Sequence, residues 1–116
     1  MAQEIEHKYL VTSDDYKNCS VVSHKIIQGY LSKDPERIVR IRIKDNRGFL
    51  TIKGKTEIDT RYEFEYEIPL EDAKRMLSLC LGTPIEKTRW IVNHEGYKWE
   101  VDEFTSPCNM VIAEIE

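Results

Sequence analysis

Apolar and polar residues alternate along most of this 116-residue chain, and this pattern limits the possible folds more than any other feature of the sequence. Successive side chains of a β-strand face opposite sides of a sheet, so the alternation predicts strands with one charged face and one apolar face. Short segments rich in Gly, Pro, Asn and Asp separate the alternating runs and are typical of tight turns. We expect eight strands, over residues 2–11, 25–32, 37–45, 48–55, 61–68, 86–93, 97–104 and 110–116.

Two helical segments interrupt these strands. Ser13 is a good N-cap for a short helix over residues 14–19. Pro69 opens a second helix over residues 70–81, in which apolar residues recur at spacings of three and four. These elements predict one mainly β domain with peripheral helices (α+β), covering residues 1–116. Because closure of eight antiparallel strands removes exposed sheet edges, we expect a closed barrel.

The composition excludes several classes of function. Lys and Arg number 17 against 21 Asp and Glu, a net charge of −4, which argues against a general nucleic-acid binder. No apolar run reaches the roughly 18 residues that span a bilayer, and the N-terminus lacks the layout of a signal peptide. The three cysteines lack metal-site spacing and indicate free thiols in a reducing compartment, so we expect a cytoplasmic protein without membrane partners.

The charges on the polar faces are sorted by sign from strand to strand. A merely solvated face would interleave the signs, because opposite charges paired across strands stabilise a sheet by about 0.2–1 kcal/mol each. Here most strands carry charges of one sign, which repel each other. This pattern indicates that a ligand or a metal neutralises these charges. The expected charged face contains Glu4, Glu6, Lys8, Arg40, Arg42, Lys44, Thr51, Lys53, Lys55, Glu63, Glu65, Glu67, Lys87, Arg89, Glu100, Asp102, Glu114 and Glu116.

We expect the charged face to line the inside of the barrel and the apolar face to pack outward against the helices. A lipocalin-like barrel is an alternative, but it requires an apolar lumen, which the charge pattern contradicts unless the two faces are exchanged. The expected apolar face contains Ile5, Tyr9, Val39, Ile41, Ile43, Leu50, Ile52, Phe64, Tyr66, Ile68, Ile91, Trp99, Val101, Ala113 and Ile115.

A charged lumen of this kind indicates the chemistry of its ligand. Carboxylate oxygens are the preferred ligands of Mg²⁺ and Mn²⁺, and Mg²⁺ sites usually combine one or two carboxylates with substrate phosphates. Arginine binds phosphate oxygens through its fork of donors and lysine binds them as a point charge. A site that holds both kinds of residue therefore favours a polyanion that also chelates metal, and polyphosphates meet this requirement.

The N-terminal residues 4–8 read EIEHK, an ExExK motif. On its own the motif is weak, but further segments follow it in a specific order through to residue 116. Together they resemble the CYTH superfamily, the triphosphate tunnel metalloenzymes, in its short prokaryotic branch. The matching segments are residues 28–31 (QGYL), 39–42 (VRIR), 51–54 (TIKG), 62–69 (YEFEYEIP), 87–89 (KTR), 99–102 (WEVD) and 113–116 (AEIE).

The resemblance implies an eight-stranded tunnel that binds a small-molecule triphosphate together with Mg²⁺ or Mn²⁺, as two ions. Glu63 and Glu65 match acidic tunnel positions that would position arginines or a metal-bound water, and with Lys8 they are the predicted catalytic residues. The predicted phosphate-binding residues are Lys8, Arg40, Arg42, Lys53, Lys87 and Arg89, and the predicted metal ligands are Glu4, Glu6, Asp102, Glu114 and Glu116.

The resemblance also predicts the reaction, which is metal-dependent hydrolysis of a phosphoanhydride, with inorganic tripolyphosphate as the favoured substrate. A class IV-type adenylate cyclase and a thiamine triphosphatase are the alternatives within the family. A non-catalytic polyphosphate-binding module is the alternative of another class, but such a module would have no use for paired carboxylates without a metal. Family members usually continue past the last ExE, so we expect this chain, a monomer or homodimer, to lack a C-terminal segment.

Overall fold

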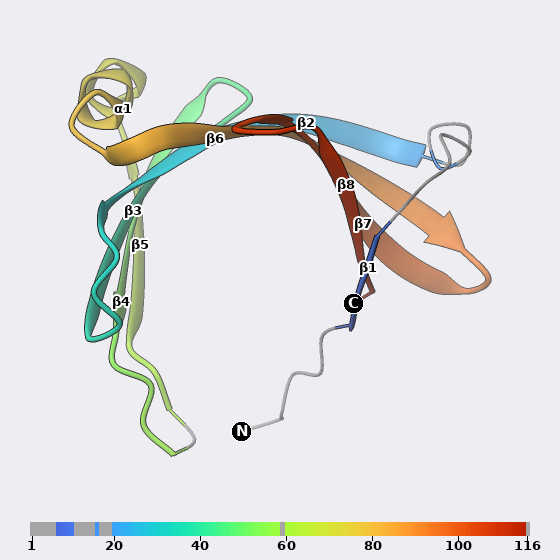
Figure 1. Cartoon of the computed structure of the whole chain (residues 1–116), viewed down its shortest axis with the longest axis horizontal. Coiled ribbons are helices and arrows are strands. Elements are labelled where there is room, and N and C mark those ends of the chain that lie inside the picture. Colours follow the sequence, from blue (N-terminus) through green and yellow to red (C-terminus); the bar gives the residue numbers. More distant parts are fainter. Residues whose placement is uncertain (1–6, 11–15, 17–19, 59, 116) are drawn as a thin grey trace. The chain divides into compact units, whose positions relative to one another are not determined.

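The computed structural model describes residues 7–10, 16, 20–58 and 60–115 and consists mainly of antiparallel β-sheet with one helix (Figure 1). The strands follow the order β1-β8-β7-β6-β2-β3-β4-β5. This order begins at β1 and ends at β5, and closure into a barrel stays a prediction. The elements are β1 (His7–Leu10), β2 (Ser20–Ser32), β3 (Arg37–Lys44), β4 (Arg47–Gly54), β5 (Glu63–Ile68), α1 (Leu70–Leu77), β6 (Leu81–His94), β7 (Tyr97–Ser106) and β8 (Met110–Ile115).

The chain divides into two compact units. Unit 1 comprises residues 1–25 and 86–116, and it carries β1, β7, β8 and most of β6. Unit 2 comprises residues 26–85 and carries β3, β4, β5, α1 and most of β2. Within the described residues, no helix is long and apolar enough to cross a membrane.

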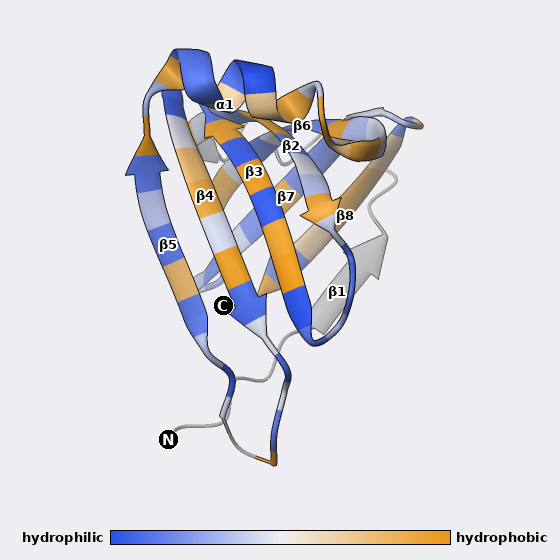
Figure 2. Cartoon of the chain, turned by 90° about the vertical axis from the view of Figure 1, so that its left-hand side faces the viewer, coloured by the Kyte–Doolittle hydropathy of each residue, from blue (hydrophilic) through white to orange (hydrophobic). Residues whose placement is uncertain are grey.

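In unit 2, the apolar face of the sheet packs against α1. Ile41 and Ile43 are buried in one cluster with Ala73 of the helix. The helix lies so close to β4 that a Cβ atom at Gly48 would come within 2.7 Å of Cβ of Ala73. Figure 2 shows hydrophobic residues alternating with hydrophilic ones along β3 and β4. The predicted assignment of residues to two faces is therefore confirmed for these strands.

Helix α1 ends at Leu77, earlier than the predicted end at residue 81. The amides of residues 78–80 each donate to the carbonyl oxygen three positions earlier, and the hydroxyl of Ser78 donates to the carbonyl oxygen of Arg75. Bonds of this spacing tighten the chain into a 3₁₀-type turn and stop the α-helix. Strand β6 then begins at Leu81, ahead of its predicted start at residue 86.

In unit 1, the core lies on one face of β6, β7 and β8. Val92, Val101 and Ala113 are buried there with Tyr16, whose hydroxyl donates to Oε2 of Glu103 at 2.8 Å. The rest of the helix predicted over residues 14–19 lies outside the described residues.

One residue of unit 1 was assigned to the wrong face. We expected Ile91 on the apolar face, but it pairs with Glu100, so this prediction is wrong. Ile91 follows Arg89 by two positions, and strand alternation therefore places it on the charged face.

Tight turns join β3 to β4 and β6 to β7, where the sequence predicts short breaks between strands. Asp45 (φ 55°) follows β3, and the pair Lys44–Arg47 closes the turn. Glu95 (φ 51°) and Gly96 (φ 79°) form the equivalent turn after β6. Positive φ angles at the centre of two-residue turns match the right-handed twist of the strands that they join.

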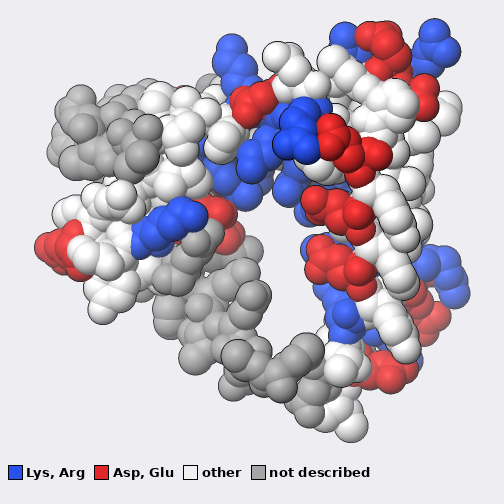
Figure 3. Space-filling model, turned by 180° about the vertical axis from the view of Figure 1, so that it is seen from behind, with Lys and Arg blue, Asp and Glu red and all other residues white. Residues whose placement is uncertain are grey.

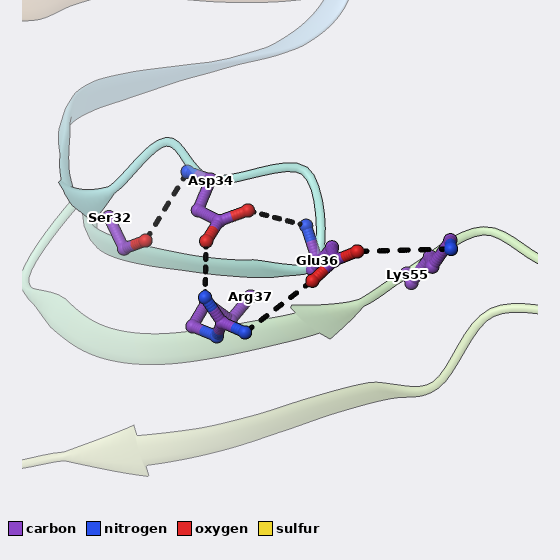
Figure 4. Close-up of polar contacts among 5 residues, drawn as sticks. All are labelled: Ser32, Asp34, Glu36, Arg37 and Lys55. Carbon is purple, nitrogen blue, oxygen red and sulfur yellow. Dashed lines mark hydrogen bonds and ion pairs between the residues drawn. The ribbon is translucent and has the colours of Figure 1, made fainter.

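The turn between β2 and β3 is held by Asp34 (Figure 4). Its carboxylate accepts hydrogen bonds from the amide of Glu36, at 3.0 Å, and from the guanidinium of Arg37. Nζ of Lys55, just after β4, lies 3.8 Å from the carboxylate of Glu36. The side chains of these residues are 39–68% exposed, so the cluster is a solvated turn in which each ion pair contributes little stability.

Candidate functional site

Each unit has a charged sheet face, opposite its apolar core. Strand alternation produces both faces, because every second residue of a strand points to the same side. Figure 3 shows acidic side chains in a column on unit 2, with basic side chains next to them. The charged face of unit 2 contains Gln28, Arg40, Arg42, Thr51, Lys53, Glu63 and Glu65, and that of unit 1 contains Lys87, Arg89, Glu100, Asp102 and Glu114.

Arg40 carries a donor without an acceptor. Its side chain is only 12% exposed, and its Nε is buried with no hydrogen-bond partner among the described residues. Nη2 donates to the hydroxyl of Thr51 at 3.3 Å, and this fully buried hydroxyl donates onward to Oε2 of Glu65 at 3.3 Å. A buried donor without an acceptor is unfavourable, so an anion that approached Nε would relieve this cost.

Arg42 is fixed by a neutral residue. Its Nε donates to Oε1 of Gln28 at 2.8 Å, and Gln28 is buried. An amide oxygen orients the guanidinium without cancelling its positive charge.

The acidic residues of β5 make weaker contacts. Glu63 and Glu65 are about half exposed, at 53% and 50%. Nζ of Lys53 lies 4.0 Å from the carboxylate of Glu63, and Nη2 of Arg40 lies 3.9 Å from that of Glu65. At these distances and exposures the carboxylates balance the positive charge only in part.

Among the described residues of the charged faces, the shortest ion pairs lie in unit 1. Asp102, buried between two cations, accepts from Nζ of Lys87 at 2.9 Å and from Nε and Nη2 of Arg89 at 2.8 and 3.0 Å. Burial disfavours the charged carboxylate, but the bonds from Arg89 and Lys87 outweigh this effect and hold the pKa of Asp102 below its ordinary value. The hydrogen bond to Asp102 is also the main cause that raises the pKa of Arg89.

Next to this group, two carboxylates face each other. Glu100 on β7 pairs directly with Glu114 on β8, and Nη1 of Arg89 lies 3.5 Å from Glu100. Like charges placed opposite each other destabilise a sheet unless they are neutralised. Two facing carboxylates fit a divalent cation of the Mg²⁺ type, which takes one or two carboxylates and completes its shell with water or phosphate oxygens. No group of three or more possible metal ligands occurs within the described residues.

Comparison with known proteins shows the family of this chain. The sequence profile of the CYTH domain matches residues 2–116. The chain belongs to the CYTH family. It is 43% identical over 119 residues to a protein of Acetivibrio thermocellus that is named inorganic triphosphatase, and the match covers 100% of this chain and 75% of the relative.

Solved structures share the CYTH fold. The crystal structure of the inorganic triphosphatase NE1496 matches with a TM-score of 0.75 and 26% identity, over 100% of this chain and 74% of the other. A putative adenylate cyclase of Bacillus halodurans matches with a TM-score of 0.62 at 18% identity, over 97% of this chain and 79% of the other. The second likeness extends to the fold alone.

The predicted site residues of this CYTH chain fall into three groups. In unit 2, Arg40, Arg42, Lys53, Glu63 and Glu65 share one face. In unit 1, Lys87, Arg89, Asp102 and Glu114 share one face, and Lys8 of β1 pairs with Glu114. The predicted metal ligands Glu4, Glu6 and Glu116 lie outside the described residues.

Three residues of the charged faces were missed as site residues. Gln28 and Thr51 are uncharged, so the sorting of charges did not identify them as site residues, although Thr51 belongs to the expected charged face and they pair with Arg42 and Arg40. Glu100 belongs to the expected charged face but not to the predicted site residues, although its carboxylate contacts Arg89 and its side chain is only 21% exposed. Its position two residues before Asp102 on the same strand was the signal that could have identified it.

Proposed function

We propose that this CYTH chain is a divalent-metal-dependent triphosphatase with inorganic tripolyphosphate as its substrate. The observation that carries the proposal is the buried Nε of Arg40, a guanidinium donor without an acceptor in the described residues, on a face that also presents Arg42 and Lys53. An oxygen-rich polyanion supplies an acceptor for this donor, which has none among the described residues. The name of the Acetivibrio thermocellus relative supports the same substrate class.

In this proposal the eight strands close into a barrel with charged residues facing its lumen. Arg40 and Arg42 bind and orient phosphate oxygens, and the Gln28 and Thr51 side chains hold the two guanidinium groups in place. Lys8, Lys53, Lys87 and Arg89 supply further positive charge along the triphosphate. Catalysis is then mostly positioning and electrostatic stabilisation of the transferred phosphoryl group.

The carboxylates have two roles. Glu4, Glu6, Glu114 and Glu116 are proposed to hold Mg²⁺ or Mn²⁺, with Glu100 facing Glu114 across the strand pair. When bound, such ions neutralise phosphate charge and lower the pKa of a bound water. Glu63 and Glu65 lie beside Lys53 and Arg40, where they orient these cations or accept a proton from water.

Release of inorganic phosphate from tripolyphosphate, with and without a chelator, tests this function. We expect release with Mg²⁺ or Mn²⁺ and none with the chelator. ATP and thiamine triphosphate are assayed in parallel. Equal rates with and without chelator would contradict the metal requirement, and cyclic AMP from ATP would identify a cyclase. Tight binding of tripolyphosphate without any release would identify a non-catalytic binding module.

A further inference from the structure

We propose that Asp102 is a positioning residue that fixes Lys87 and Arg89, and that it is not a metal ligand. The inference rests on the proposed function in one respect only, namely that Lys87 and Arg89 face the triphosphate. It departs from the role that the sequence predicts for Asp102, and it follows from the contacts of this carboxylate within unit 1.

Both oxygens of Asp102 are already engaged by cations. Oδ1 accepts from Nε of Arg89 at 2.8 Å, and Oδ2 accepts from Nζ of Lys87 at 2.9 Å and from Nη2 of Arg89 at 3.0 Å. A carboxylate offers about four acceptor positions, so these three bonds use most of its capacity. A divalent ion bound to either oxygen would also lie next to two positive side chains, and that repulsion opposes its binding.

The strand register separates Asp102 from the other described carboxylates of this face. On its β6 side Asp102 pairs with Arg89, and on its β8 side it pairs with Ile112, an apolar residue. The facing carboxylates Glu100 and Glu114 form the neighbouring cross-strand pair. The row of Asp102 therefore contains one carboxylate between a cation and an apolar residue, whereas the row of Glu100 contains two adjacent carboxylates, flanked by Ile91 and Lys8.

The contacts also explain what Asp102 contributes. Lys87 and Arg89 have long side chains that lose conformational freedom when a ligand orders them. Asp102 orders both in advance, and Nζ of Lys87 lies in addition 5.3 Å from the centre of the Phe104 ring. The ammonium and guanidinium groups carry three and five N–H donors in total, more than the carboxylate of Asp102 accepts. Asp102 thereby presents two oriented cations to phosphate oxygens, which is the arrangement that electrostatic catalysis requires.

The test compares three variants of the full chain. Asp102→Asn keeps the size of the side chain but removes its charge and places an amide donor beside a cation. Glu114→Gln is the comparison for loss of a proposed metal ligand. Asp34→Asn is the matched control, because it makes the same substitution in the solvated β2–β3 turn, away from either charged face. Mn²⁺ binding to the free protein is measured by electron paramagnetic resonance, and phosphate release is measured at several Mn²⁺ concentrations.

We expect Asp102→Asn to bind Mn²⁺ within about twofold of the parent, whereas loss of a true ligand weakens binding by about tenfold or more. We also expect kcat/KM to fall by roughly tenfold to a hundredfold at saturating Mn²⁺. The rate loss of the double variant Asp102→Asn with Arg89→Gln should be smaller than the product of the two single losses, because Asp102 acts in part through Arg89. Asp34→Asn should match the parent in every measurement.

Two results would overturn the proposal. One is a loss of Mn²⁺ affinity in Asp102→Asn as large as that in Glu114→Gln. The other is a set of rate losses that multiply when Asp102→Asn and Arg89→Gln are combined. If Asp102→Asn does not fold, the double variant Lys87→Met with Asp102→Asn is measured instead, because it removes a cation together with the carboxylate. A loss of Mn²⁺ affinity in this double variant as large as that in Glu114→Gln would likewise overturn the proposal. A parent protein that releases no phosphate would refute the proposed function, while Mn²⁺ binding would still decide the role of Asp102.

Discussion

Nε of Arg42 donates a 2.8 Å hydrogen bond to the side-chain oxygen of Gln28 on the neighbouring strand. Two positions earlier on the same face, Nε of Arg40 is buried and has no acceptor in the part of the chain that the structure describes. One arginine is thus anchored through Nε and the other is not. The two residues are expected to contribute alike to anion binding and differently to stability.

Arg42→Met should lose both activity and stability. The substitution removes the guanidinium charge, which we expect to lower kcat/KM by about a hundredfold or more. It also leaves the buried amide of Gln28 without this donor, at a cost of about 1–3 kcal/mol. For a chain of this size that corresponds to a melting temperature lower by roughly 3–10 °C. Phosphate release and thermal unfolding, measured on one preparation, check both quantities.

Arg40→Met should lose activity without losing stability. It removes a buried donor that has no acceptor, and the methionine side chain fills much of the same volume. We expect a melting temperature equal to or above that of the parent, and a rate loss as large as in Arg42→Met. A melting temperature below that of Arg42→Met would show that Nε of Arg40 is satisfied in the folded protein.

Acidification should reveal the contribution of Asp102 to stability. Its pKa in the folded state lies below its ordinary value, so the folded state favours the charged carboxylate. The resulting stability is fully present above the unfolded-state pKa, which is about 3.9, and is lost as the pH falls through the lower folded-state pKa. The difference in melting temperature between the parent and Asp102→Asn should therefore be constant at pH 5–8 and shrink below about pH 4. A difference that grows on acidification would contradict this assignment.

Strand alternation was sufficient to predict most of the sheet. It placed Ile41 and Ile43 on the core face and Arg40 and Arg42 on the other, because a period of two leaves only these two choices. The end of α1 could not be predicted in the same way. Cys80 continues the apolar spacing of the helix and still packs into the core, but it does so from a tight turn after Leu77.

The contacts within the charged faces were less predictable than the faces themselves. Alternation places Asp102 with Arg89 but does not show which of several oppositely charged neighbours a side chain selects. That choice depends on register, which pairs Asp102 with Arg89 and Ile112 and pairs Glu100 with Glu114. Loops and bulges set the register, and the sequence pattern constrains these only loosely.

The cysteines should differ in reactivity. Burial raises the pKa of the Cys80 thiol, whose Sγ lies 3.4 Å from the carbonyl oxygen of Met76, whereas Cys108 is exposed. Because the thiolate is the reactive form, iodoacetamide should alkylate Cys108 well before Cys80 at pH 7–8. Mass spectrometry of the separate peptides follows each site. Denatured protein gives the reference alkylation rate for each cysteine. Equal alkylation rates of Cys80 and Cys108 in the folded protein would mean that the turn after α1 opens readily.

Thr51→Val tests whether the hydroxyl between Arg40 and Glu65 matters for activity rather than for folding. Valine keeps the shape of the fully buried side chain and removes both of its 3.3 Å hydrogen bonds. Glu65 is half exposed and can bond to water instead, so we expect the melting temperature to change by no more than about 3 °C. Arg40 loses its nearest fixed acceptor, and we expect kcat/KM for tripolyphosphate to fall by roughly tenfold.

Thr51→Ser restores the hydroxyl and should restore most of the rate. If Thr51→Val is fully active, Arg40 does not depend on this hydroxyl; if Thr51→Ser is as slow as Thr51→Val, the lost methyl group rather than the hydrogen bond limits the rate.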